Sequence, residues 1–258
     1  MPLQLPLREA KPRTTGLTMV IDNGVPLNYF SDVVESHGEH FDFVKFGWGT
    51  SVVTTNFHKK LDILKEANID FYLGGTLFEK YILQNRFDEF RSLCQAYGSR
   101  YVEVSNGTID LSNDDKADYV KRLTDDFSVI SEVGSKDQVT SETMAPTKWI
   151  SSIQADIAAG AVLVTLETRE SGESGICRSN GELRYGLIED ILSSGIDHEK
   201  LLFEAPSKEL QSYFVQRVGP NANLGNIAVS DIIPLETVRL GLRSETLLAF
   251  ELSLHSIV

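Results

Sequence analysis

Short apolar runs alternate with amphipathic segments along almost the whole chain, and this alternation restricts the fold more than any other feature of the sequence. Most of the runs are continuously apolar, which is typical of strands buried on both faces of a parallel sheet. The eight runs are Leu17–Asp22, Phe43–Gly47, Ile69–Gly75, Tyr101–Ser105, Val129–Gly134, Val162–Thr168, Leu201–Pro206 and Leu224–Ala228. The sequence therefore predicts eight parallel strands joined by helices.

The segments between the runs carry apolar residues at helical spacing, and several end at a glycine, a common C-terminal cap. Eight strand–helix units of this length match an α/β fold of the (β/α)8 TIM barrel type. A doubly wound sheet is the alternative, but the Gly47-Trp48-Gly49 turn lacks the third glycine and the acidic partner of a dinucleotide site. We expect a single barrel domain over residues 16–258, preceded by an N-terminal extension over residues 1–15.

The chain has 258 residues and a formal net charge of −13 at pH 7. This charge argues against nucleic acid or an anionic membrane surface as a partner, because both repel an acidic protein. Anionic small molecules could still bind where lysine, arginine, backbone N–H groups or a metal ion gather locally.

The cysteines, Cys94 and Cys177, form no C-x-x-C motif, so neither a disulfide framework nor a zinc ribbon is expected. Residues 1–15 lack the apolar core of a signal peptide, and no apolar run reaches membrane-spanning length. We therefore expect a cytoplasmic protein without a membrane partner.

Polar residues stand at the C-terminal ends of the predicted strands, where (β/α)8 barrels carry out their chemistry. In chain order these are Asp22, Lys45, Thr76, Glu103 with Ser105, Glu132, Glu167 with Arg169, Glu204 and Asn226. Four glutamates in one partly dry mouth would repel one another, so a divalent cation or nearby basic side chains must offset them. Oxygen ligands suit Mg²⁺, whereas the histidines show no spacing typical of zinc. For any single glutamate, an ion pair that only fills the barrel top is the alternative.

The segment after the fifth run combines an acid, a glycine and a lysine. Glu132 would point to one face of the strand, and Gly134 would let the chain turn so that Lys136 reaches the same mouth. A carboxylate beside an ammonium group is a way to hold and tune a proton donor. A solvated ion pair on a turn is the other interpretation.

The end of the eighth run indicates an anion site. Gly225 and Asn226 precede Ser230-Asp231, a candidate N-cap of the final helix. Barrels often bind phosphate at this position through backbone N–H groups and a helix N-terminus.

Taken together, six segments resemble the phosphosulfolactate synthase family. They are Phe43-Val44-Lys45-Phe46-Gly47-Trp48-Gly49-Thr50-Ser51, Gly74-Gly75-Thr76-Leu77-Phe78-Glu79, Glu132-Val133-Gly134, Arg169-Glu170-Ser171-Gly172, Phe203-Glu204-Ala205-Pro206 and the helix from Leu235-Glu236-Thr237 to Gly241-Leu242-Arg243. The first segment is long and unusual, so the resemblance is specific. It extends from about residue 16 to residue 243.

The resemblance implies a Mg²⁺-dependent (β/α)8 barrel, a lyase that adds sulfite to phosphoenolpyruvate to give (2R)-phospho-3-sulfolactate. The general acid proposed for the family falls on Lys136 of this chain. The chain departs from the family at Ser135, which replaces the first lysine of a Lys-Lys pair. It departs from archaeal relatives at Asn23 and Asn106, where those relatives carry lysine and aspartate. These departures resemble the bacterial branch.

The reaction suggests a role for each candidate residue. Negative charge builds on the substrate carboxylate after sulfite attack, so we expect a metal ion there, and Lys136 with Glu132 to manage the proton. The candidate metal ligands are Glu103, Glu167 and Glu204. The candidate substrate ligands are Lys45, Arg169, Gly225 and Asn226.

Two other functions compete with this interpretation. A Schiff-base aldolase would use Lys45 or Lys136 as its nucleophile. A barrel without catalytic activity, serving in stress tolerance as described for plant relatives of the family, is the alternative from another class. The sequence does not decide whether the product leads to coenzyme M or to sulfolactate. We also expect a homo-oligomer, from the aromatic side chains of Tyr81, Phe87 and Tyr97.

Overall fold

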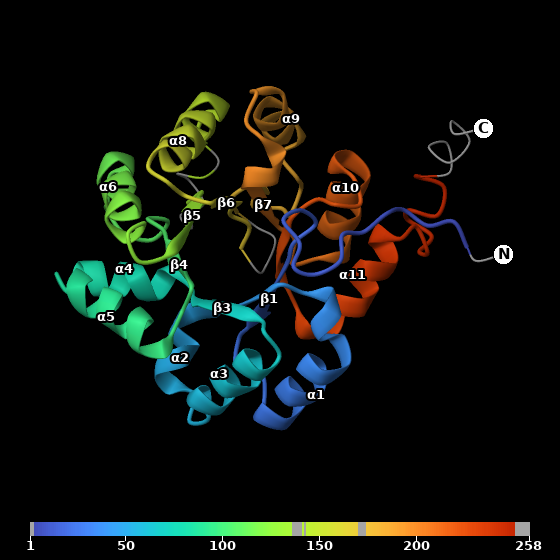
Figure 1. Ribbon diagram of the computed structural model, residues 1–258. Helices are drawn as coiled ribbons and strands as arrows, with labels where there is room; N and C mark the ends of the chain where they lie inside the picture. Colours follow the sequence, from blue (N-terminus) through green and yellow to red (C-terminus); the bar gives the residue numbers. More distant parts are fainter. Residues whose placement is uncertain (1–2, 136–140, 142, 170–173, 251–258) are drawn as a thin grey trace.

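The computed structural model describes residues 3–135, 141, 143–169 and 174–250, in which eight strands lie at the centre of a ring of helices (Figure 1). The strands are β1 (Thr18–Asp22), β2 (Phe43–Phe46), β3 (Asp70–Leu73), β4 (Tyr101–Val104), β5 (Ser128–Val133), β6 (Leu163–Leu166), β7 (Leu201–Glu204) and β8 (Leu224–Ile227). Each lies within or beside one of the predicted apolar runs.

All paired strands are parallel, in the order β3-β2-β1-β8-β7-β6-β5-β4. The barrel is nearly closed, with β3 beside β4 at the ends of this order. At the seam between them, the Ser99 hydroxyl donates a hydrogen bond of 3.0 Å to the Phe71 carbonyl oxygen. The prediction of a single-domain (β/α)8 barrel is confirmed, and the doubly wound alternative is wrong.

Helices cover the outside of the strands. The α-helices are α1 (Leu27–His37), α2 (Thr50–Val53), α3 (Phe57–Glu66), α4 (Gly75–Leu83), α5 (Phe87–Tyr97), α6 (Asn113–Leu123), α8 (Pro146–Ala158), α9 (Tyr185–Ser193), α10 (Lys208–Val218) and α11 (Ile232–Arg239). The short 3₁₀ helices are η1 (Gly38–His40), η2 (Gly47–Gly49), η3 (His198–Lys200) and η4 (Val229–Asp231). In the described part of the chain no helix has the length and apolarity needed to cross a membrane.

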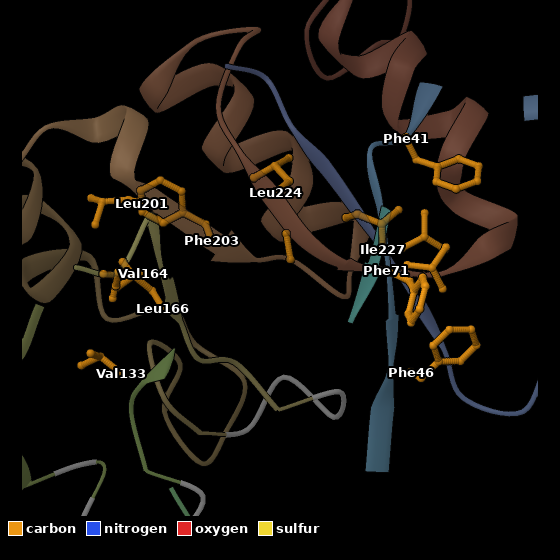
Figure 2. Packing of buried hydrophobic residues seen from close by; sticks show 14 of the residues in the cluster. Phe41, Phe46, Phe71, Val133, Val164, Leu166, Leu201, Phe203, Leu224 and Ile227 are labelled. Carbon is orange, nitrogen blue, oxygen red and sulfur yellow. The ribbon is translucent and has the colours of Figure 1, made fainter. Parts of the chain in front are cut away.

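The main core lies between the strands and the helices, because successive strand residues point to opposite faces. Figure 2 shows side chains of this layer, among them Phe46, Phe71 and Phe203. The Phe46 ring lies 4.8 Å from Phe57 of α3, and the Phe203 ring lies 4.4 Å from Phe214 of α10. This packing holds each strand, and therefore its C-terminal end, in a fixed place.

A second, smaller core fills the inside of the barrel. It consists of the inward-facing strand residues and their neighbours, namely Leu17, Met19, Phe43, Tyr72, Ile130, Leu163 and Leu202. Inward-facing positions nearer the C-terminal ends carry charged residues instead. Apolar side chains thus fill the barrel beneath its polar end.

The described part of the N-terminal extension lies against the opposite, N-terminal end of the barrel. Arg8 pairs with Glu236 of α11 at 3.0 Å and donates to the Asn221 side chain at 2.7 Å. Arg13 pairs with Asp42, just before β2, at 3.1 Å. These largely buried contacts fasten residues 3–15 to the barrel.

The aromatic residues expected to mark an oligomer contact belong to the fold itself. Phe87 is buried, and Tyr81 and Tyr97 are partly buried against the main core. Their spacing reflects helix packing, so these side chains give no support to the homo-oligomer, which stays a prediction.

Candidate active site

A cavity of about 480 Å³ opens at the C-terminal ends of the strands. It is lined by Ile21, Lys45, Gly47, Trp48, Gly74, Gly75, Thr76, Glu103, Thr108, Glu132, Glu167, Thr168, Arg169, Glu204 and Asn226. A cavity of about 890 Å³ lies at the N-terminal ends and includes Lys11, Asp42 and Asp70. Only the first is placed where barrels of this kind carry out catalysis.

The ammonium group of Lys45 lies among three carboxylates on the floor of the cavity. Its Nζ is 3.0 Å from an oxygen of Glu103, 3.3 Å from Glu132 and 3.2 Å from Glu204. All four side chains are buried. The strands β2, β4, β5 and β7 each supply one member, as expected from the predicted strand ends. We call these four residues the Lys45 cluster.

The cluster shifts the pKa values of its own members. Burial lowers the pKa of Lys45, but the carboxylates of Glu103, Glu204 and Glu132 outweigh it and hold that pKa well above its usual value. Burial also raises the pKa of Glu204 to about 7, against the lowering by Lys45. Burial raises the pKa of Glu103 in the same way. Lys45 therefore stays protonated, and Glu204 exchanges a proton near neutral pH.

Backbone amides fix the second oxygen of two of these carboxylates. The Gly75 N–H donates to Glu103 Oε2 at 2.5 Å, and the Thr168 N–H donates to Glu204 Oε2 at 2.9 Å. A Cβ at position 75 would lie 2.3 Å from the Ser105 hydroxyl oxygen, so only glycine fits this close approach. The conformation of Glu103 thus depends on the glycine at the start of α4.

Asp22, the first strand-end acid, is not part of this cluster. It pairs with Lys60 of α3, and its Oδ1 accepts hydrogen bonds from the N–H groups of Gly24 at 2.8 Å and Val25 at 2.9 Å. Asp22 and Lys60 are both 1% exposed. This acid stabilises the turn after β1, which is the structural role left open for any single acid at the barrel top.

A third buried lysine supports the cluster from outside the barrel. Lys116 of α6 pairs with Asp156 of α8 at 2.6 Å and donates to the backbone oxygen of Glu132 at 2.9 Å. The sequence analysis missed both Lys60 and Lys116. Each follows its helix's buried stripe, where a lysine at an apolar position signals a buried partner.

Glu167 and Arg169 follow β6 and both line the cavity, Glu167 buried and Arg169 exposed at its edge. Gly134 after β5 has a φ of +153°, and a Cβ there would lie 2.6 Å from the Glu167 Cβ. The chain therefore turns over Glu167 at a position that requires glycine. Lys136, the predicted general acid, lies outside the described residues.

The two residues predicted to bind phosphate lie in different places. Asn226 lines the cavity, whereas Gly225 is buried below it, where an added Cβ would lie 2.8 Å from the Met19 Cε and 3.3 Å from a Leu202 methyl group. Close packing against Met19 and Leu202 therefore requires a glycine at position 225, and its contact with phosphate stays a prediction. Asp231 precedes α11 but makes no side-chain capping bond.

The oxygen donors of the cavity fit Mg²⁺ only as an ion shared with a substrate. Among the described residues, no group of three or more acidic, histidine or cysteine side chains is arranged to hold a metal ion. Mg²⁺ needs fewer, because one or two carboxylates with water and substrate oxygens complete its shell. The buried Oδ1 of Asn226 has no hydrogen-bond partner in the part of the chain that the structure describes.

Neither cysteine is a nucleophile. Burial raises the pKa of Cys94 to about 12 and that of Cys177 to about 11, so both stay as thiols at neutral pH. Cys94 packs in α5, as its place on the apolar stripe predicts.

Solved structures similar to this chain confirm the barrel. A crystal structure of 3-hexulose-6-phosphate synthase aligns over 86% of this chain and 99% of its own length, with a TM-score of 0.55 and 12% identity. At this identity the likeness concerns the fold alone.

Comparison by sequence reaches further. The family model of (2R)-phospho-3-sulfolactate synthase (ComA) matches residues 6–245. A phosphosulfolactate synthase of Bacillus subtilis (strain 168) is 49% identical over 95% of this chain and 97% of its own length. One of Methanocaldococcus jannaschii is 39% identical over 90% of this chain and 93% of its own length. The chain therefore belongs to the (2R)-phospho-3-sulfolactate synthase family, as the resemblance of its motifs predicts.

Proposed function

We propose that this chain is a lyase that adds sulfite to phosphoenolpyruvate, giving (2R)-phospho-3-sulfolactate, in the cavity above the Lys45 cluster. One observation carries the proposal. In a chain of this family, a buried ammonium group surrounded by three carboxylates forms the floor of the cavity at the catalytic end of the barrel. The reaction joins the sulfur of sulfite to the methylene carbon, and the adjacent carbon then takes up a proton.

The protonated state of Lys45 favours this addition over an aldolase that forms a Schiff base at the same residue. Imine formation requires a neutral amine, and the three carboxylates hold the pKa of Lys45 well above its usual value. Lys45 instead supplies a fixed positive charge that partly offsets the glutamates and attracts the substrate anions.

Arg169 is the proposed second anion ligand. Its side chain is exposed at the edge of the cavity, and a guanidinium group can bind a phosphate or sulfite group through two hydrogen bonds. Asn226, on the β8 side of the cavity, is the proposed ligand for a substrate hydrogen-bonding group or the metal ion.

The oxygen donors support Mg²⁺ as the cofactor. The candidate ligands Glu103, Glu167 and Glu204 all line the cavity, together with Asn226. We propose that oxygen atoms of these residues hold the ion. When bound, Mg²⁺ would act as a Lewis acid toward the substrate carboxylate.

Two groups are proposed to manage the proton. Lys136 is proposed as the general acid, as the resemblance implies, and Glu132 is proposed to orient it from the same segment. Glu204, with a pKa of about 7, can take up a proton near neutral pH. This protonation would make the cluster less negative as two anionic substrates enter.

The test is an assay of phosphoenolpyruvate consumption with and without sulfite and with and without Mg²⁺. We expect consumption only when both are present, with formation of a carbon–sulfur bond, and its loss in Lys136→Ala. Consumption of phosphoenolpyruvate that is independent of sulfite would overturn the proposal. The absence of any consumption would also overturn it and would favour a barrel without catalytic activity. An imine trapped by borohydride with a carbonyl substrate would identify a Schiff-base aldolase.

We also propose a cytoplasmic location, which the buried free thiols of Cys94 and Cys177 support. We propose assembly of identical chains, which size-exclusion chromatography with light scattering would test. The use of the product for coenzyme M or for sulfolactate is a further part of the proposal.

A further inference from the structure

Trp48 stands at the edge of the cavity, at the centre of the 3₁₀ helix η2 that follows β2. Its side chain lines the cavity and is nevertheless 52% exposed. The predicted functions above give this residue no role. The other tryptophan of the chain, Trp149, is 0% exposed and lies in the main core.

The backbone of Trp48 has a conformation that its side chain disfavours. Its φ of 51° and ψ of 24° fall in the left-handed region, where the Cβ of a bulky residue meets its own carbonyl group. In the described residues, the non-glycine positions with positive φ are Trp48, Asn68, Asn85 and Asn226. Asparagine tolerates this region and tryptophan does not, so Trp48 is the unusual member.

Surrounding contacts hold the turn in place. A Cβ at Gly47 would lie 2.9 Å from Ile21, so β1 packs directly under the turn. The Gly74 N–H donates to the Phe46 carbonyl oxygen at 3.0 Å, and the Thr50 hydroxyl donates to the Asp22 carbonyl oxygen at 3.3 Å. The neighbouring strands therefore hold the Trp48 indole at the rim of the cavity. The backbone of Trp48 is strained there, and its side chain is not fully buried.

We propose that Trp48 is a substrate contact whose indole face covers bound phosphoenolpyruvate. This inference rests on the proposed function. Strained backbone persists where the site uses it, and here it places an apolar ring beside a cavity whose floor is charged. The enol methylene is the apolar part of phosphoenolpyruvate. An aromatic wall against it would bury the exposed half of the indole and keep water from the reacting carbon.

Acrylamide quenching of tryptophan fluorescence in the wild-type protein tests the contact directly. Because Trp149 is fully buried, collisional quenching reports mainly on Trp48. Phosphoenolpyruvate is added without sulfite, so no turnover occurs, and its binding is measured separately by calorimetry with and without Mg²⁺. We expect the quenching constant to fall about twofold as phosphoenolpyruvate saturates, since the exposed half of the ring becomes covered.

The outcomes separate this inference from the proposed function. Phosphoenolpyruvate that binds by calorimetry without changing the quenching of Trp48 would overturn the contact and leave the proposed function standing. Phosphoenolpyruvate that does not bind under any condition would overturn both. Protection that depends on protein concentration and not on ligand would overturn the contact, because Trp48 would then face a second copy of the chain.

Variants give a second reading. Trp48→Gly removes the ring and suits the left-handed backbone, so we expect a KM for phosphoenolpyruvate about tenfold higher, with an unchanged unfolding temperature. Trp48→Phe keeps an aromatic face and should raise KM only about twofold. Val53→Ala, at an 80% exposed position of α2 outside the cavity lining, is the matched control and should match wild type. Equal KM values in wild type and Trp48→Gly would contradict the contact.

Discussion

Three buried lysines of this barrel differ in how many carboxylates surround them. Lys60 of α3 pairs with Asp22 at the end of β1, and Lys116 of α6 pairs with Asp156 of α8. Neither pair lines the cavity. Lys45 has three carboxylates around it and lines the cavity. The first two environments balance one positive with one negative charge, whereas the Lys45 cluster retains an excess of negative charge.

This difference separates structural charge from functional charge. A balanced buried pair has no net charge, so it gains little stability from an additional ion. Burial raises the pKa values of Glu103 and Glu204, and the neighbouring carboxylates add to this rise. The unbalanced cluster therefore gains stability from a further cation or from protons. The unbalanced cluster, and not burial or charge by itself, therefore marks the site.

Replacing Lys45 should have the largest effect on activity. Lys45→Met keeps a similar shape but leaves three carboxylates without their cation, so we expect sulfite-dependent turnover to fall roughly 10³-fold, about 4 kcal/mol. Steady-state kinetics on protein shown by circular dichroism to be folded would measure this loss. Lys80→Met, on the exposed face of α4, is the control. A variant that keeps a tenth of wild-type turnover would refute a special role for the cluster.

Replacing Lys116 should instead affect stability. Lys116→Met leaves Asp156 buried without its partner and should lower the free energy of unfolding by about 3 to 4 kcal/mol in urea titrations. The double variant Lys116→Met/Asp156→Leu removes both charges and should recover most of that loss. If the single variant costs less than about 1 kcal/mol, the balanced pair does not have the structural role described.

The pH dependence of stability should reveal the unbalanced cluster. Burial raises the pKa of Glu204 from 4.5 to about 7, so the folded protein holds a proton that the unfolded chain releases in this range. Stability should therefore fall as pH rises from about 4.5 to about 7, and Glu204→Gln should flatten the curve by ~3 kcal/mol over that window. Denaturant titrations at several pH values would measure both curves. Parallel curves would contradict this assignment.

Replacing Arg8 should have the smallest effect of the four. Arg8→Gln removes the pair with Glu236 at the N-terminal end of the barrel and should cost about 2 kcal/mol of stability without changing KM. Arg217→Gln, in an exposed pair with Glu189, is the matched control and should leave the unfolding midpoint unchanged. A loss of substrate affinity in Arg8→Gln would show that the two ends of the barrel are coupled.

The sequence predicts the barrel and the convergence of its glutamates because both follow from regular geometry. Strands of a parallel barrel end at one rim, so inward-facing residues at those ends must meet. Glu103, Glu132 and Glu204 do so. Lys45 is among the predicted strand-end residues, but its place at the centre of the three glutamates depends on a side-chain conformation that the sequence does not give.

Other features depend on contacts between distant segments. The role of Asp22 is decided by the rotation of α3, which brings Lys60 against it. The need for a glycine at position 225 comes from the Met19 side chain on the neighbouring strand β1. The left-handed backbone of Trp48 has no signal beyond its flanking glycines. In each case local preference leaves several states open, and tertiary packing selects one.

A crystal structure of the protein with phosphoenolpyruvate and Mg²⁺, without sulfite, would test the central claim most directly. The account predicts the ligand in the cavity of about 480 Å³, within hydrogen-bonding distance of Lys45 or Arg169. Phosphoenolpyruvate bound in the cavity of about 890 Å³ at the other end of the barrel, with the Lys45 cluster untouched, would contradict it.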